Sequence, residues 1–169
     1  MVARGRQQTT IAITGGALSG ILGGIALSLY MLLATIARGA DPWLAFKFAS
    51  VAFYGDRALQ HGFSADTVIW GILAHFAIAA GWGLLFGLLV FGASRGATVF
   101  AGVVWGFVVW IAMYHIVLPL AGLADIAQGS SAAGSIIAHI IFGVSLAIGF
   151  LPFQRPMGYS STPLTTRSF

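Results

Sequence analysis

Residues 11–37 read IAITGGALSGILGGIALSLYMLLATIA, a stretch without a charged residue. A helix rises about 1.5 Å per residue, so this stretch is long enough to cross the hydrocarbon core of a bilayer, which is about 30 Å thick. Two arginines, Arg4 and Arg6, precede it. The stretch exceeds the roughly 7–15 apolar residues of a cleavable signal peptide, so we interpret it as a membrane anchor that is retained.

The composition of the whole chain agrees with that interpretation. Hydrophobic residues make up 59% of the 169 residues and charged residues 7%, and the mean hydropathy is +0.95. A soluble domain carries about 25% charged residues, so this chain could not cover a soluble surface. The absence of cysteine excludes disulfides, thiolate metal sites and iron–sulfur clusters. The basic residues are scattered singly, which argues against a nucleic-acid partner.

Three further apolar runs follow the first. Together they predict an all-α integral membrane protein, a four-transmembrane-helix bundle with spans near residues 11–37, 66–91, 97–122 and 132–151. We expect residues 1–153 to form a single transmembrane domain. Residues 154–169 are rich in Ser, Thr and Pro, and we expect them to form a mobile cytoplasmic tail.

The segment between the first two spans is the only sizeable polar one. Asp41-Pro42 is a good helix start, because Asp can cap a helix and Pro suits its first position. On a helical projection, one stripe then carries polar side chains and the other side carries mostly apolar ones. The polar stripe consists of Lys47, Ser50, Tyr54, Arg57 and His61. We predict an amphipathic helix near residues 42–60 that lies in the outer membrane–water interface.

Glycines recur at four-residue spacing along the predicted spans. They are Gly16, Gly20 and Gly24 on the first span, Gly83 and Gly87 on the second, and Gly102 and Gly106 on the third. Small residues let helix backbones approach closely, so we predict that these stripes are packing faces. Gly20-Ile-Leu-Gly-Gly24 resembles Gly102-Val-Val-Trp-Gly106, and Ile72-Leu-Ala-His75 resembles Ile136-Ile-Ala-His139. Two helical hairpins related by duplication would give this pattern.

The charges at the ends of the runs predict the orientation. With the N-terminus in the cytoplasm, five arginines lie inside: Arg4, Arg6, Arg95, Arg155 and Arg167. Arg38, Lys47 and Arg57 then lie outside together with all four acids. The positive-inside rule therefore favours a multi-pass protein with both termini in the cytoplasm.

Three histidines are predicted to lie at one depth in the membrane. His75, His115 and His139 each sit roughly seven residues from the outer end of a span, about 10 Å below the outer surface at the helical rise. A lone membrane histidine is commonly a packing residue that bonds to a neighbouring helix. Ionisable groups inside spans are costly, however, and by default mark functional sites. His75 and His139 fall on small-residue faces, whereas the face of His115 is ambiguous.

Two cofactor chemistries fit a shared histidine site. Imidazole suits zinc and copper, and Met31 at a similar depth could add a thioether for Cu(I), although a methionine there also suits simple core packing. Two histidines on facing helices could instead hold a b-type haem axially. Arg38 or Arg57 at the outer surface could then meet the haem propionates.

Two readings need no cofactor. Histidines near the outer surface titrate around pH 6.5 and could sense acid or handle protons. Alternatively, the chain is an accessory subunit that packs against a larger membrane complex, or against copies of itself, through its glycine stripes, and the histidines join helices. No catalytic residue is predicted, so the chain is not expected to be an enzyme on its own. The lipid bilayer is an expected partner in every one of these readings.

A resemblance to a known family arises in the third and fourth spans. His115-Ile-Val-Leu-Pro119-Leu-Ala-Gly-Leu123 and Ala138-His139-Ile-Ile-Phe-Gly143 resemble the histidine pattern of the small YagU-like proteins, and Ala74-His75-Phe76 is similar too. The likeness covers the four spans as spacing and departs from that family in the outer loop and the tail. It implies a bacterial inner-membrane location and an association with acid tolerance, and it brings no catalytic residues.

Overall fold

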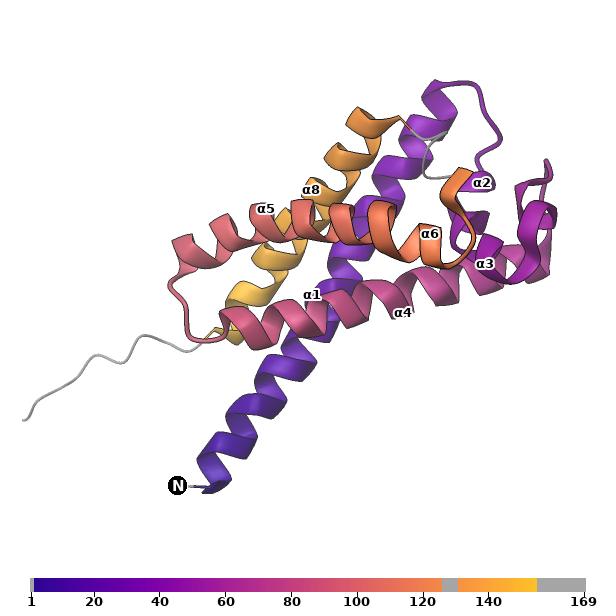
Figure 1. Ribbon diagram of the computed structural model, residues 1–169. Helices are drawn as coiled ribbons and strands as arrows, with labels where there is room; N and C mark the ends of the chain where they lie inside the picture. Colours follow the sequence, from indigo (N-terminus) through magenta and orange to yellow (C-terminus); the bar gives the residue numbers. More distant parts are fainter. Residues whose placement is uncertain (1, 126–130, 155–169) are drawn as a thin grey trace, which may run out of the picture.

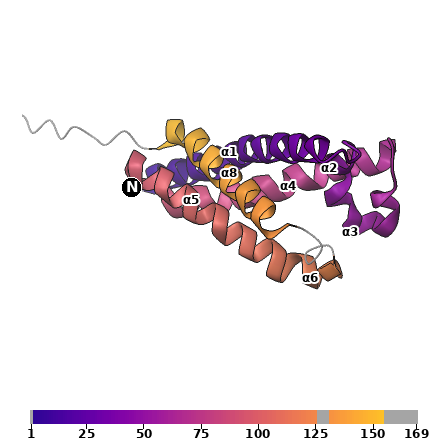
Figure 2. The same ribbon diagram turned by 90° about the horizontal axis from the view of Figure 1, so that it is seen from above.

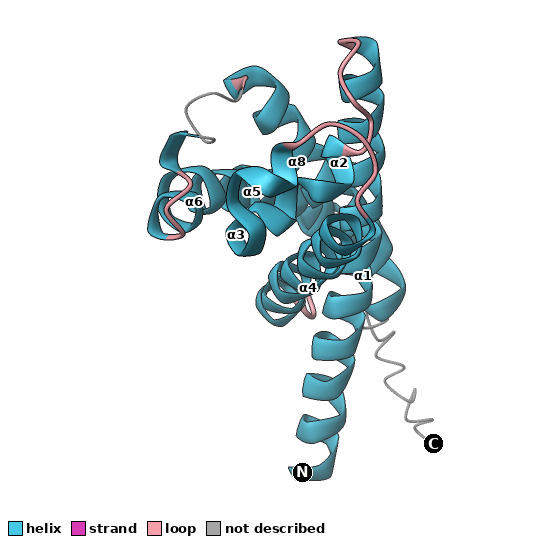
Figure 3. Ribbon diagram, turned by 90° about the vertical axis from the view of Figure 1, so that its right-hand side faces the viewer, coloured by secondary structure: helices cyan, strands magenta, loops and turns pink. Residues whose placement is uncertain are grey.

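The computed structural model describes residues 2–125 and 131–154, and within these ranges the chain is helical without strands (Figure 3). Four helices are long and apolar enough to cross a membrane, as the sequence predicts. They are α1 (Val2–Ala37), α4 (Ala65–Val90), α5 (Arg95–Ala112) and α8 (Ala132–Phe150). A π-helical turn, η3 (Met113–Val117), and α6 (Leu118–Leu120) extend α5, and η4 (Leu151–Phe153) ends α8.

Helix α1 lies at the back of the bundle and packs against both α4 and α8, while α5 packs against α8 (Figure 1). The α1–α4 contact is backbone to backbone. A Cβ atom on Gly16 would lie 2.5 Å from the carbonyl oxygen of Gly83, and a Cβ on Gly83 would lie 2.5 Å from the Cα of Gly20. Such distances leave no room for a side chain, so glycine is required for this approach.

The α5–α8 contact is built in the same way. A Cβ on Gly102 would meet the carbonyl of Gly143, and one on Gly106 would meet the carbonyl of His139. Each of the two hairpins that the internal likeness suggests therefore packs through its own glycine stripe. Gly24, the last glycine of the first stripe, faces Ala79 and the ring of Phe76.

The α1–α4 hairpin contacts the α5–α8 hairpin closely through α1 and α8 and only loosely through α4 and α5. Between α1 and α8 the backbones are close, since a Cβ on Gly23 would lie 2.8 Å from the carbonyl oxygen of Phe142. Helices α4 and α5 instead diverge from the turn that joins them (Figure 2). Aromatic side chains bridge the narrow part of this gap, where the Trp105 ring lies 5.9 Å from that of Trp82 and 6.0 Å from that of Phe86.

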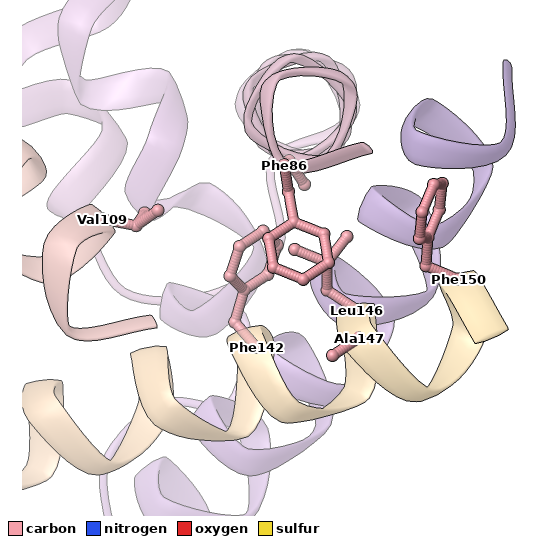
Figure 4. Close-up of a cluster of buried hydrophobic side chains, with 7 residues drawn as sticks. Phe86, Val109, Phe142, Leu146, Ala147 and Phe150 are labelled. Atoms are coloured by element: carbon pink, nitrogen blue, oxygen red, sulfur yellow. The ribbon is translucent and has the colours of Figure 1, made fainter. Parts of the chain in front are cut away.

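A buried apolar cluster lies between α4, α5 and α8 (Figure 4). Phe86 from α4 and Phe150 from α8 meet edge to face with ring centroids 6.1 Å apart. The cluster also contains Ala79, Val109, Phe142, Leu146 and Ala147. Helix α8 supplies four of the seven residues of this cluster: Phe142, Leu146, Ala147 and Phe150.

The segment between α1 and α4 differs from the single amphipathic helix predicted near residues 42–60. It consists of four short pieces: α2 (Leu44–Lys47), η1 (Phe48–Ser50), α3 (Val51–Tyr54) and η2 (Gly55–Leu59). Gly55 has φ +54° and breaks the helix. Lys47 and Ser50, predicted to lie on the polar stripe, are buried. The Lys47 ammonium donates to the carbonyls of Gln60 and Gly62, which satisfies it without exposure to water.

The first residue of the predicted tail, Gln154, packs against the helices. Gln154 is buried and donates through Nε2 to the carbonyl of Val90 (3.0 Å) and to Oγ1 of Thr98 (2.7 Å). Its Oε1 accepts from the Gly92 amide at 2.8 Å. Gln154 therefore fixes the α4–α5 turn to the end of α8. The rest of the predicted tail, residues 155–169, lies outside the described residues.

Candidate functional site

A cavity of about 180 Å³ occupies the wide end of the space between α4 and α5. Helices α1 and α8 form its back, α4 and the η3–α6 extension of α5 form its sides, and residues 48–52 of η1 and α3 cover it. Most of its lining is aliphatic or aromatic. The side chains that bring nitrogen, oxygen or sulfur to it are Met31, His75, Trp82, Met113, Tyr114, Ser135 and His139.

His75 projects from α4 toward α1. Its Nε2 lies 3.1 Å from the carbonyl oxygen of Gly24 and 3.0 Å from Oγ of Ser28. A carbonyl oxygen can only accept, so Nε2 carries the proton and Nδ1 is the unprotonated nitrogen. This bond reaches the Gly24 carbonyl because the small Gly24 and Ala79 let α1 and α4 approach closely.

His139 on α8 has the opposite tautomer. Its Nδ1 lies 2.8 Å from the carbonyl oxygen of Ser135, one turn earlier, so Nδ1–H donates and Nε2 is unprotonated. Ser135 is itself held in place, since its Oγ donates to the Ala132 carbonyl and accepts from Nε1 of Trp110 at 2.9 Å. The Tyr114 ring meets the His139 ring edge to face at 5.8 Å.

The two imidazoles therefore share three features. Both line one cavity, both are partly buried, and each donates one ring N–H to a main-chain carbonyl. Metal-binding histidines are commonly oriented by such a bond, which fixes the tautomer and leaves the other nitrogen as a ligand. The same bonds would also serve two histidines that only join helices. Met31, the predicted thioether, borders the same cavity.

Three residues of the predicted site do not reach the cavity. His115 lies in the π-helical turn, is exposed, and meets the Trp110 ring edge to face at 5.3 Å. Arg57 pairs with Asp66 (Nη2 to Oδ2, 2.6 Å), and its side chain is 60% exposed. Arg38 is exposed at the end of α1. The three histidines are predicted to lie at equal depth from the helical rise, but depth does not determine the rotation of each helix about its axis.

Within the described ranges, no three side chains among His, Asp and Glu lie close enough together to hold a metal ion. The histidine contribution to a site is thus limited to His75 and His139. Any further ligand must come from a residue of another type. The other side chains of the cavity lining that suit a transition metal are the thioethers of its methionines.

Met113 is the cavity residue that the sequence reasoning missed. A signal for it was present, because Met113 follows Gly106 by seven residues, or two helical turns, and so continues the packing face of α5 toward α8. Met113 also packs against the buried apolar cluster. Its position adds a second methionine to the lining of the cavity.

Comparison with known proteins identifies the family and does not identify an activity. No curated protein and no solved structure matches the chain. Nothing found tests the resemblance to the YagU-like proteins, which stays an expectation. A family model described as a family of unknown function, DUF6789, matches residues 11–157, and the chain belongs to that family.

Proposed function

We propose that the protein is a multi-pass membrane protein that binds a transition-metal ion in the cavity between α4 and α5, through His75, His139 and Met31. The membrane assignment is supported by the four long apolar helices and by the large apolar side chains that they expose. Leu18, Leu33, Leu89 and Phe100 are each more than half exposed. Lipid chains would cover such surfaces, whereas water would not. We place the protein in a bacterial inner membrane with both termini in the cytoplasm.

One observation carries the metal proposal. Two imidazoles from different helices line one cavity, and each presents an unprotonated nitrogen because its other nitrogen donates to a main-chain carbonyl. An unprotonated imidazole nitrogen can accept a hydrogen bond or bind a metal ion, but it cannot donate a hydrogen bond. Met31 on α1 would add a thioether to these two nitrogens.

The surroundings favour an ion over a b-type haem. A haem held by His75 and His139 would need cationic partners for its propionates. The arginines predicted for that role, Arg38 and Arg57, are exposed and do not line the cavity, and Arg57 is already paired with Asp66. An ion needs only the donors that the cavity itself supplies.

A second candidate function is binding of an apolar molecule that carries a hydroxyl group. The observation that favours it is the volume of about 180 Å³, because a single water occupies only about 10–15 Å³ by this kind of measure. The mostly apolar lining suits such a molecule, and an unprotonated imidazole nitrogen would accept a hydrogen bond from its hydroxyl. In this case the histidines select the ligand without a metal.

Metal analysis of the purified full-length protein separates these candidates. We expect the wild type, loaded with zinc or copper in detergent, to retain about one ion per chain. Substitutions His75→Gln and His139→Gln should abolish retention, because each removes one imidazole. His115→Gln is the matched control, since that histidine is exposed outside the cavity, and it should retain the ion.

The remaining outcomes decide among the alternatives. An absorption spectrum with a haem band, lost in His75→Gln, would overturn the ion in favour of haem. Retention of an organic molecule and no metal, seen by mass spectrometry of the intact protein, would favour the second candidate. A wild type that retains neither would leave His75 and His139 as helix-joining residues of an accessory or acid-responsive subunit, and the binding proposal would be wrong.

A further inference from the structure

We propose that the cavity is selective for copper(I) over zinc(II), and that Met113 is a fourth ligand beside His75, His139 and Met31. This inference rests on the proposed metal site and specifies the ion. It assigns a ligand role to a residue that lies in none of the predicted sites. The resulting donor set would be two imidazole nitrogens and two thioether sulfurs.

The first argument is the distribution of the donors. Met31 lies on α1, His75 on α4, Met113 on η3 and His139 on α8, so each wall of the cavity supplies one. Both methionines of the described residues line this one cavity. Four donors on four separate elements can surround an ion, whereas donors on one helix face could approach it from one side only.

The second argument is the local backbone at Met113. Met113 is the first residue of the π-helical turn Met113–Val117, which interrupts the regular hydrogen bonding of α5 and its extension. Such turns cost stability relative to α-helix and occur frequently at functional sites. The turn joins α5, which packs on α8, to the short α6 beside the cavity. Met113 is the residue at which α5 passes into this turn.

The third argument is charge. Among the described residues, no carboxylate lines the cavity, and the four proposed ligands are neutral. A divalent ion would keep its full double charge in a low-dielectric space. The cost of burying a charge grows with its square, so a monovalent ion pays roughly a quarter of that cost. Thioether ligands also select Cu(I), while the chain has no cysteine to offer a stronger sulfur ligand.

The competing explanation is that Met113 is a flexible filler of the core, as methionine often is. A filler would affect folding but would not affect the choice between two metals. The experiment must therefore report on metal selectivity and on the ligand atoms, in addition to affinity.

The full-length protein in detergent is titrated anaerobically with Cu(I) against a chromophoric Cu(I) chelator, and separately with Zn(II) against a zinc chelator. We expect the wild type to bind Cu(I) more tightly than Zn(II). Met113→Leu keeps the size and apolar character of the side chain. It should weaken Cu(I) binding about tenfold or more and leave Zn(II) binding unchanged. Ile116→Leu, an exposed change in the same turn, is the control and should alter neither.

X-ray absorption of the copper-loaded wild type, labelled with selenomethionine, gives a readout that needs no variant. Two selenium neighbours of copper are expected, and one or none would overturn the role of Met113. Zinc binding as tight as Cu(I) binding would overturn the selectivity. If Met113→Leu matches the wild type while His75→Gln and His139→Gln lose the ion, this inference fails and the proposed function stands. If the wild type binds no ion, both fail.

Discussion

His75 on α4 and Gly24 on α1 are joined by a hydrogen bond of 3.1 Å from the imidazole Nε2 to the main-chain carbonyl oxygen. The carbonyl belongs to a helix, so it cannot move away without disturbing α1. This bond fixes which nitrogen of His75 is protonated. The Ser28 hydroxyl, 3.0 Å from the same nitrogen, is a second partner that can be removed without changing the main chain.

Ser28→Ala is therefore expected to weaken metal binding at the proposed site without unfolding the protein. The Gly24 carbonyl retains the tautomer, but the ring is less well oriented, and loss of such a supporting partner typically lowers metal affinity about 10-fold or more. The destabilisation should be small, on the order of 0.6 kcal/mol. Metal titration beside thermal unfolding checks both. An affinity equal to that of the wild type would show that Ser28 does not orient His75.

The α1–α4 contact predicts a sharp difference between two glycines of α4. Gly83→Ala places a Cβ 2.5 Å from the Cα of Gly20 and 2.7 Å from its nitrogen, so the helices must separate. We expect a loss of about 1–3 kcal/mol, as in other overpacked contacts, and Gly20→Leu should be worse. Gly81→Ala is the matched control, because a Cβ there meets nothing within 4 Å.

Unfolding in detergent, followed by helical circular dichroism, measures the two variants side by side. Gly81→Ala should be neutral or slightly stabilising, since alanine is the better helix former. Equal stability of Gly83→Ala and the wild type would mean that α1 and α4 do not approach each other as closely as the glycines allow.

Sequence predicted the elements of this fold well because the signals for them are local. The uncharged run at residues 11–37 and its three successors specify helices through length and hydropathy alone. The four-residue spacing of Gly16 and Gly20 predicts a packing face, and the structure places that face against Gly83. Neither inference requires knowledge of a distant residue.

The errors lie where distant residues decide the outcome. Lys47 was assigned to a polar stripe by helical projection, but the carbonyls of Gln60 and Gly62 allow it to be buried. His115 was grouped with two other histidines by depth, and its exposed position beside Trp110 depends on how α5 is rotated against α8. The cavity arises because α4 and α5 diverge, and no local sequence pattern predicts that divergence.

Gln154→Ala is expected to loosen the α4–α5 turn. The change removes the acceptor of the Gly92 amide and one of the two partners of both the Val90 carbonyl and the Thr98 hydroxyl, which keep their bonds to the Ala93 amide and the Ser94 carbonyl. We therefore expect a loss of about 0.5–1.5 kcal/mol. Gln60→Ala, at an exposed side chain, is the control and should be neutral. Hydrogen exchange at residues 91–94 measures the turn directly. If Gln154→Ala and the wild type show equal hydrogen-exchange protection at residues 91–94, Gln154 does not hold the α4–α5 turn in place.

Asp41 is expected to make the loop before α4 sensitive to acid. The hydrogen bond from the Gly62 amide, 2.5 Å from Oδ2, is the main cause that holds the pKa of Asp41 below its ordinary value of 3.8, and the Trp43 amide assists. A carboxyl whose pKa is lowered in the folded state stabilises that state above its ordinary pKa. The contribution is lost as the pH falls through the lower, folded value.

Hydrogen exchange of the Gly62 amide below pH 4 measures this loss. In the wild type the amide should lose protection as Asp41 becomes protonated. In Asp41→Asn the protection should be lower at neutral pH and should no longer change with acid. A wild-type amide whose protection is independent of pH in that range would show that Asp41 does not hold the loop.

Cysteine labelling tests the orientation that we propose from the arginines. The chain contains no cysteine, so a single introduced cysteine is labelled without background from native thiols. His61 lies in the loop before α4 and Arg95 begins α5, at opposite ends of α4, and both are exposed. With both termini in the cytoplasm, His61→Cys faces outward and Arg95→Cys faces inward. A membrane-impermeant maleimide added to intact cells should therefore label His61→Cys at once and label Arg95→Cys only after permeabilisation. The reverse pattern would mean that the protein has the opposite orientation in the membrane. Labelling of both cysteines in intact cells would rule out α4 as a membrane span.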